Sequence, residues 1–171
     1  MLKVRGIHHI TAICRDMERT TAFYTRVLGM RLVKQTVNYD DPNTKHFYFG
    51  DEQGRPGTVI TFFEYPEAVA GRVGAGSTHH IAFMVEDEEE QDRFKAHLEA
   101  QGIHVNGPFD RTYFRSIYFR DPDGHILEIA TRGPGFAVDE PEDELGTHMI
   151  LPGTTKTRDL SRYDLDSDER V

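Results

Sequence analysis

The sequence predicts an α+β protein made of two βαβββ modules that together form a curved mixed sheet. The first observation is a repeat: Gly-Ile-His-His-Ile-Thr at residues 6–11 recurs as Ser-Thr-His-His-Ile-Ala at residues 77–82. Each copy begins a strand-like alternation, which leads through an acidic turn into an amphipathic segment with helical spacing. Three strand-like runs follow each amphipathic segment. Self-similarity of this kind indicates a duplicated structural unit.

The first module is expected over residues 4–66. Its helix is predicted at 17–28, after an acidic turn that ends at Asp16, and Gly29 stands where a helix-ending glycine belongs. Turns rich in Asp, Pro, Asn and Gly separate the strands that follow. These three strands are predicted at 30–39, 46–50 and 58–65.

The second module is expected over residues 77–133, after a glycine-containing linker at 70–76. Its helix is predicted at 89–101, and Gly102 takes the place of Gly29. Its strands are predicted at 103–109, 115–120 and 125–131, with the turn Asp-Pro-Asp-Gly at 121–124 closing the last hairpin.

We expect one domain over residues 1–152, in which a segment at 134–152 docks on the two modules. Residues 153–171 are polar and charged, without a hydrophobic period, and are predicted to form a flexible tail.

Composition narrows the classes of partner. Lys and Arg number 20 against 29 Asp and Glu, and the formal net charge of −9 disfavours nucleic acid and acidic membrane surfaces. No apolar run is long enough to cross a bilayer, and the first residues lack the apolar stretch of a signal peptide. The single cysteine, Cys14, gives no reason to expect an oxidising compartment, so a cytoplasmic location is predicted.

Strand alternation selects candidate metal ligands from the two His-His pairs. Neighbouring strand residues point to opposite faces, so one metal takes only one histidine of each pair. His9 and His80 lie on the faces opposite those expected to pack on the helices. Glu128 lies between apolar residues of the last strand, where a lone carboxylate is costly to bury unless its charge is compensated. Two imidazoles and one carboxylate form the set that leaves open positions on non-haem iron, so a metal pocket is predicted. For His46 and His125, as for the other histidines, an exposed or hydrogen-bonded role is expected.

Three phrases resemble the glyoxalase, bleomycin-resistance and extradiol-dioxygenase superfamily, also called vicinal oxygen chelate proteins. They are His-His-Ile-Thr at 8–11, Phe-Tyr-Thr-Arg-Val-Leu-Gly at 23–29, and Asp-Pro-Asp-Gly-His-Ile-Leu-Glu at 121–128. The resemblance covers residues 4–133, and the superfamily's metal ligands match His9, His80 and Glu128.

A narrower resemblance points to hydroquinone-type ring-cleaving dioxygenases. It is carried by residues 32–42, 54–58, 111–120 and 135–152. It implies that five further residues bind or protonate the substrate: His8, Thr11, His79, Arg111 and Tyr118. Those dioxygenases usually hold four modules in one chain, whereas this sequence looks like the first and last modules joined.

The leading functional hypothesis is an extradiol-type ring-cleaving dioxygenase acting on a hydroquinone or catechol-like phenol. Fe(II) is the expected metal, with Mn(II), Zn(II) or Ni(II) as alternatives, and O2 and a small aromatic molecule are the expected substrates. One alternative is a glyoxalase-like lyase or isomerase, which uses a fourth protein ligand. That ligand would fall near Thr61, a poor metal ligand, and the nearby Glu64 is expected to point to the opposite face of the strand. Another alternative is a resistance protein that binds an antibiotic. A homodimer is expected, because it would restore four modules and cover the aromatic residues of the second and third strand runs of the first module.

Overall fold

The computed structural model of the chain describes residues 2–149; the predicted tail at 153–171 lies outside the described residues. The first module contains β1 (His9–Cys14), α1 (Met17–Ala22), the π-helical turn η1 (Phe23–Val27), β2 (Arg31–Val37), β3 (Lys45–Gly50) and β4 (Val59–Glu64). The second contains β5 (Ile81–Val85), α2 (Glu88–Ala100), β6 (Asn106–Asp110), β7 (Arg115–Arg120) and β8 (Ile126–Thr131), followed by a short 3-10 turn, η2 (Phe136–Val138).

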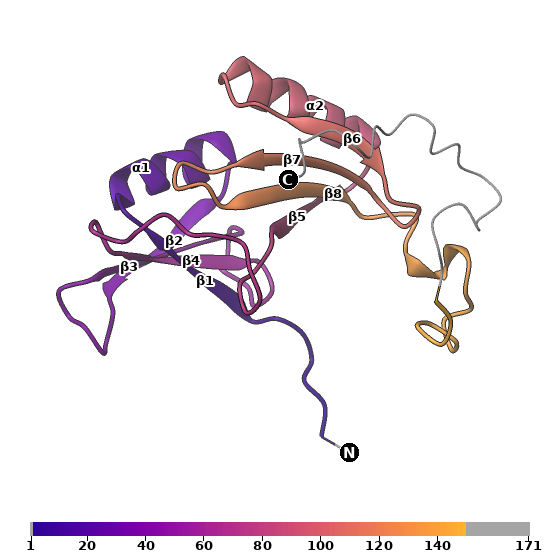
Figure 1. The fold of residues 1–171 in the computed structure, drawn as a ribbon, viewed down its shortest axis with the longest axis horizontal. Helices are drawn as coiled ribbons and strands as arrows, with labels where there is room; N and C mark the ends of the chain where they lie inside the picture. Colours follow the sequence, from indigo (N-terminus) through magenta and orange to yellow (C-terminus); the bar gives the residue numbers. More distant parts are fainter. Residues whose placement is uncertain (1, 150–171) are drawn as a thin grey trace. The chain divides into compact units, whose positions relative to one another are not determined.

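The strands form two four-stranded mixed sheets with the same topology (Figure 1). Their orders are β1-β4-β3-β2 and β5-β8-β7-β6. The first strand of each module pairs in parallel with the last, and the β2–β3, β3–β4 and β6–β7 pairs are antiparallel. The two predicted βαβββ modules are therefore confirmed. The eight strands are divided between two open sheets, whereas a single curved sheet was expected.

Side-chain caps mark where the two helices begin, and a glycine follows the end of each helical segment. Asp16 accepts hydrogen bonds from the backbone amides of Glu18 and Arg19 before α1, and Asp87 accepts one from Glu90 at the start of α2. Gly29 and Gly102 both have left-handed backbone, with φ of +70° and +76°, as the predicted helix-ending glycines require. The first helix differs from the prediction in its second half, where the backbone widens into the π turn η1.

The chain divides into two compact units. The first unit contains the residues up to His79 and also the turn Arg120–His125 between β7 and β8. Its core lies between η1 and one face of the first sheet, where Tyr24 packs on Phe49 and Phe62. All three rings are fully buried.

The turn Arg120–His125 is bound to the rest of the first unit by charged groups. Asp123 accepts hydrogen bonds from the guanidinium groups of Arg15 and Arg19, at 3.1 and 2.8 Å. The buried carboxylate of Asp121 accepts one from the Tyr24 hydroxyl at 3.2 Å and contacts His125 Nδ1 at 2.9 Å. His125 is therefore hydrogen-bonded, as expected.

The second unit contains His80–Phe119 and the described residues from Ile126 onward. Its α2 packs on the sheet through Leu98 and through a buried amide, that of Gln91. Gln91 Nε2 donates hydrogen bonds to the carbonyls of Arg115 and Ile129, at 2.7 and 2.8 Å, and so joins α2 to β7 and β8.

Strand β6 begins three residues later than predicted, because the chain before it completes the end of α2. The amide of Ile103 donates to the carbonyl of Leu98, which removes Ile103 from the strand ladder. Within β6, Gly107 has φ of +106°, and a Cβ there would lie 2.8 Å from the carbonyl oxygen of Ser116. A glycine is required at this close approach.

The described part of the segment after β8 packs on the β6–β7 connection. Phe136 in η2 contacts the Tyr113 ring at a centroid distance of 5.2 Å, and the Tyr113 hydroxyl donates to Asp139 at 3.1 Å. Across residues 2–149, no helix combines the length and apolar character needed to cross a membrane.

Candidate active site

In the first unit, β1 carries two predicted site residues on the face away from the core. Its side chains alternate, so that Cys14 is buried, Ile10 and Ala12 are half-buried, and His9 and Thr11 are exposed. Burial raises the pKa of the Cys14 thiol to about 11, so this thiol stays protonated in the core. The face predicted for His9 and Thr11 is confirmed.

His8 and His9 do not point in opposite directions, as strand alternation led us to expect. Their Nδ1 atoms are 3.0 Å apart and their rings meet edge-on. His8 precedes the first residue of β1, and its carbonyl accepts a hydrogen bond from Gly57, so the regular strand pleat does not govern its side chain. The structure therefore brings His8 beside His9, where it can position the His9 ring.

In the second unit, Glu128 is the buried carboxylate that the sequence predicted. Its exposed fraction is 2%, and it lies on β8 between buried Leu127 and Ile129. The Ser116 hydroxyl donates to Oε1, and His80 Nε2 lies 2.9 Å from Oε2. Two polar partners thus compensate a carboxylate that would otherwise be costly to bury.

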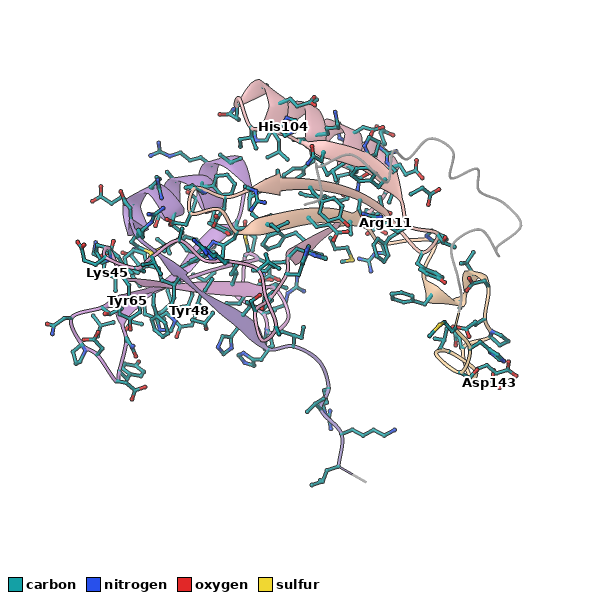
Figure 2. All side chains as sticks on the ribbon, in the orientation of Figure 1. Lys45, Tyr48, Tyr65, His104, Arg111 and Asp143 are labelled. Carbon is teal, nitrogen blue, oxygen red and sulfur yellow. The ribbon has the colours of Figure 1, made fainter. Side chains whose placement is uncertain are left out.

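Tyr118 contacts the His80–Glu128 pair, and Arg111 contacts Tyr118. The buried Tyr118 ring meets the His80 ring edge-on at a centroid distance of 5.7 Å. Arg111, at the β6–β7 connection (Figure 2), donates from Nη2 to the Tyr118 hydroxyl at 3.3 Å. Its guanidinium also lies over the Phe109 ring, 5.2 Å from the centroid. Tyr118 is therefore brought next to the candidate ligand pair and Arg111 next to Tyr118, while His79 lies exposed just before His80.

The structure also reveals polar residues that the sequence did not single out. The face of the first sheet that points away from the core, and carries His9 and Thr11, is its open face. On this face, His46 Nε2 lies 2.9 Å from the Thr61 hydroxyl, which in turn donates to Thr11 at 2.9 Å. The Tyr48 hydroxyl lies 3.2 Å from His46 Nδ1. His46 and Tyr48 alternate along β3 as His9 and Thr11 do along β1, and this pattern was the available signal.

Two of the three predicted metal ligands, His80 and Glu128, lie together in the second unit and suit a divalent cation. His80 and Glu128 present one imidazole nitrogen and one carboxylate oxygen at hydrogen-bond distance, which is the chemistry that first-row metals prefer. His9 belongs to the other unit. Over residues 2–149, no three His, Cys, Asp or Glu side chains are gathered as a metal-ion site.

Two curated proteins with catalytic names align with most of this chain. A protein of Bacillus subtilis (strain 168) that is named as a ring-cleaving dioxygenase, MhqE, is 41% identical to this chain. The match covers 89% of this chain and 50% of the length of MhqE. The chlorohydroquinone/hydroquinone 1,2-dioxygenase of Sphingobium indicum is 31% identical over 71% of this chain and 38% of its own length. The chain thus spans half or less of the length of these two relatives.

Solved structures give the same fold. A crystal structure of a protein from Bacillus subtilis subsp. subtilis str. 168, assigned by name as a dioxygenase, is 42% identical, with a TM-score of 0.72 over 78% of this chain and 43% of that one. A mutant of the fosfomycin resistance protein FosX from Listeria monocytogenes, solved with Mn(II) and 1S,2S-dihydroxypropylphosphonic acid, is 26% identical. Its TM-score is 0.58 over 77% of this chain and 94% of that one.

A family model covers both modules. The model of the Glyoxalase/Bleomycin resistance protein/Dioxygenase superfamily matches residues 6–129, which includes all eight strands except the last two residues of β8. This chain is a member of that superfamily.

Proposed function

We propose that this chain is a non-haem Fe(II)-dependent dioxygenase that cleaves the ring of a hydroquinone or catechol-like phenol. His9, His80 and Glu128 would hold the metal. The observation that carries the proposal is the buried Glu128 carboxylate with His80 Nε2 at 2.9 Å, because a metal is the natural partner of such a pair. The relatives named as ring-cleaving and hydroquinone dioxygenases support the reaction class.

The protein's own side chains would bind the phenol and handle its protons. Bound Fe(II) would supply sites for O2 and for a substrate oxygen, and would move electrons between them. Tyr118 and Arg111, which are hydrogen-bonded to each other, would hold a substrate hydroxyl or its phenolate. His8, His79 and Thr11 would complete the set of groups that bind the substrate and accept or return its hydroxyl protons.

A four-ligand isomerase is the weaker reading of the same fold. Its fourth ligand would come from β4, where Thr61 is fully buried and hydrogen-bonded to His46 and Thr11. Glu64 faces the helix side, where it accepts a hydrogen bond from the Met17 amide at 2.7 Å and pairs with Lys45 at 3.0 Å. Neither residue offers a free carboxylate to the open face.

Oxygen uptake is the direct test. Metal-free protein is loaded anaerobically with Fe(II) and mixed with hydroquinone, catechol and their substituted forms, while an oxygen electrode records consumption. Uptake that depends on both metal and phenol supports the proposal. The resemblance to FosX gives a second candidate, so the same protein loaded with Mn(II) is offered fosfomycin and product formation is followed by phosphorus NMR. Fosfomycin opening without phenol-dependent oxygen uptake would replace the dioxygenase with a resistance enzyme.

We also propose a homodimer, in which two copies restore the four modules of the longer relatives. The chain covers 50% of MhqE, so two copies match its length. The sequence also suggested that a dimer would cover exposed aromatic residues of the first module. This reason is wrong in part, because Phe49 and Phe62 are buried against Tyr24 within the first unit. Sedimentation velocity at micromolar concentration tests the assembly, and a stable species of 19.6 kDa would contradict it.

A further inference from the structure

A line of four polar side chains crosses the open face of the first sheet. It runs from Tyr48 to His46 on β3, then to Thr61 on β4 and Thr11 on β1, with heavy-atom distances of 3.2, 2.9 and 2.9 Å. The strand register places Tyr48 beside Thr61 and Thr61 beside Thr11, so the contacts come from three adjacent strands. Tyr48 is labelled on this sheet in Figure 2.

The hydrogen bonds of this line all run in one direction when Thr61 donates to Thr11. With the single hydroxyl proton of Thr61 given to Thr11, the Thr61 oxygen accepts from His46 Nε2–H. The imidazole nitrogen Nδ1 then accepts from the Tyr48 hydroxyl. Thr11 accepts from Thr61, and its own hydroxyl proton is therefore directed to a different acceptor. Thr11 is exposed and lies two residues after His9 on the same face of β1.

The surroundings of His46 favour the neutral ring. The ring lies between those of Tyr48 and Phe63, with centroid distances of 4.3 and 4.2 Å. Burial, and secondarily the charge of His9, lower the pKa of His46. A neutral imidazole has one donor and one acceptor nitrogen, and both are used here.

We propose that His46 is a positioning residue which, through Thr61, holds the Thr11 hydroxyl so that it donates a hydrogen bond to an oxygen of the bound phenol. This inference rests on the proposed function, since it takes the phenol as the ligand of this face. It adds His46, Thr61 and Tyr48 to the residues that determine how the substrate is oriented. A purely structural role would require only that the strands pair, which their backbone ladder already achieves.

The first measurement needs no activity. Long-range 1H–15N correlation NMR of metal-free protein distinguishes the two neutral forms of each histidine, and we expect the Nε2–H form for His46. Replacing Thr61 by Val removes the acceptor and should shift the Nε2–H resonance of His46, while Thr61→Ser should leave that resonance close to its position in the parent protein. A His46 ring in the Nδ1–H form overturns the proposal.

The second measurement is anaerobic calorimetry with hydroquinone on the metal-loaded protein, accompanied by oxygen-uptake kinetics. His46→Phe, which fits between the two rings, and Thr61→Val should each raise the Kd and KM about fivefold, the effect of one hydrogen bond, with unchanged metal content. Thr61→Ser should bind within about twofold of the parent protein, within the spread of such interactions. His104→Phe is the matched control, because His104 is exposed and pairs only locally with Asn106.

The outcomes separate this inference from the proposed function. If the parent protein binds hydroquinone and consumes oxygen but the Thr61→Val and His46→Phe variants behave like it, the positioning role is overturned and the dioxygenase stands. If the parent protein neither binds hydroquinone nor consumes oxygen, the proposed function fails, and the substrate assigned to Thr11 fails with it.

Discussion

The two units use equivalent positions of the same topology for different chemistry. Thr61 pairs with Thr11 two residues after His9, and Glu128 pairs with Ala82 two residues after His80. The first unit therefore has a buried hydroxyl where the second has a buried carboxylate. Each is hydrogen-bonded from the neighbouring strand, Thr61 by His46 on β3 and Glu128 by Ser116 on β7.

This difference gives the two copies of one module different binding chemistry. A carboxylate with a histidine beside it can neutralise and bind a cation, whereas a hydroxyl with a histidine beside it can only donate and accept hydrogen bonds. Under the proposed function, the second unit would supply two of the three metal ligands. The first would supply one ligand, His9, and a neutral hydrogen-bonding surface.

The largest effect is expected from removing the carboxylate of the second unit. Glu128→Gln keeps the shape and an acceptor for Ser116 but loses the negative charge. Metal affinity should fall by at least about a hundredfold, because losing a ligand exceeds the 10- to 100-fold loss typical of outer partners of metal sites. Elemental analysis after Fe(II) loading and competition with a chelator measure the change.

Glu64→Gln makes the same chemical change in the first unit, on the face that contacts the helix. It should leave metal affinity unchanged. Equal metal loss in both variants would mean that general destabilisation, and not the ligand, explains the effect of Glu128→Gln.

Making the first unit resemble the second should destabilise it. Thr61→Glu places a larger, charged side chain at a position with 0% exposure. His46 can donate one hydrogen bond to the new carboxylate, whereas Glu128 has two polar partners, Ser116 and His80. Overpacking and an undercompensated carboxylate should lower the free energy of unfolding by about 3 kcal/mol.

Urea unfolding of the metal-free protein, followed by far-ultraviolet circular dichroism, measures this change. Thr61→Val, which changes polarity without adding volume or charge, is the control and should cost about 1 kcal/mol. A Thr61→Glu protein as stable as the parent would mean that the first unit tolerates the same buried carboxylate as the second.

Local patterns predicted the fold and the faces of the strands. The repeat, the acidic helix starts and the glycines at 29 and 102 predicted both modules, and strand alternation placed His9 and Thr11 on the open face. The same rule failed for His8, which precedes β1 and turns its ring toward His9. Alternation applies only where a strand ladder fixes the backbone.

The line from Tyr48 to Thr11 could not be predicted in the same way. It depends on which residues of β3, β4 and β1 lie side by side, and this register is set by long-range pairing. His46 therefore looked like an ordinary histidine until its neighbours were known. Ser116 escaped notice for the same reason, because its partner Glu128 is twelve residues away along the chain.

A smaller effect is expected for Tyr118, the ring beside His80. Tyr118→Phe retains the ring packing and removes only the hydroxyl that Arg111 contacts. Metal content should remain unchanged, while turnover with hydroquinone should fall about tenfold or more, as general acid–base groups usually contribute at least that much. Tyr113→Phe, whose hydroxyl contacts Asp139 away from this pair, is the control. Unchanged turnover of Tyr118→Phe would remove Tyr118 from the reaction.

The smallest effect concerns the turn Arg120–His125, which ties the first unit together through Asp121. The pKa of His125 is raised above its ordinary 6.5, first by its hydrogen bond to Asp121, opposed by burial, and then by the charges of Asp121 and Asp123. A group whose pKa is raised by folding stabilises the folded state fully below its unfolded pKa and loses that contribution as pH rises through the folded pKa. The free energy of unfolding should therefore fall as the pH rises from about 6.5 to values above the raised pKa of His125.

The loss should amount to no more than about 1 kcal/mol, because the His125 side chain is 29% exposed and solvent screens the pair. Urea unfolding at a series of pH values measures it. His125→Asn should flatten this pH dependence while keeping a hydrogen bond to Asp121, and the matched change His104→Asn, at an exposed histidine, should leave it in place. A His125→Asn protein with the parent's full pH dependence would place the titrating group elsewhere. The turn would then be held chiefly by the Tyr24–Asp121 hydrogen bond and the Arg15 and Arg19 contacts with Asp123.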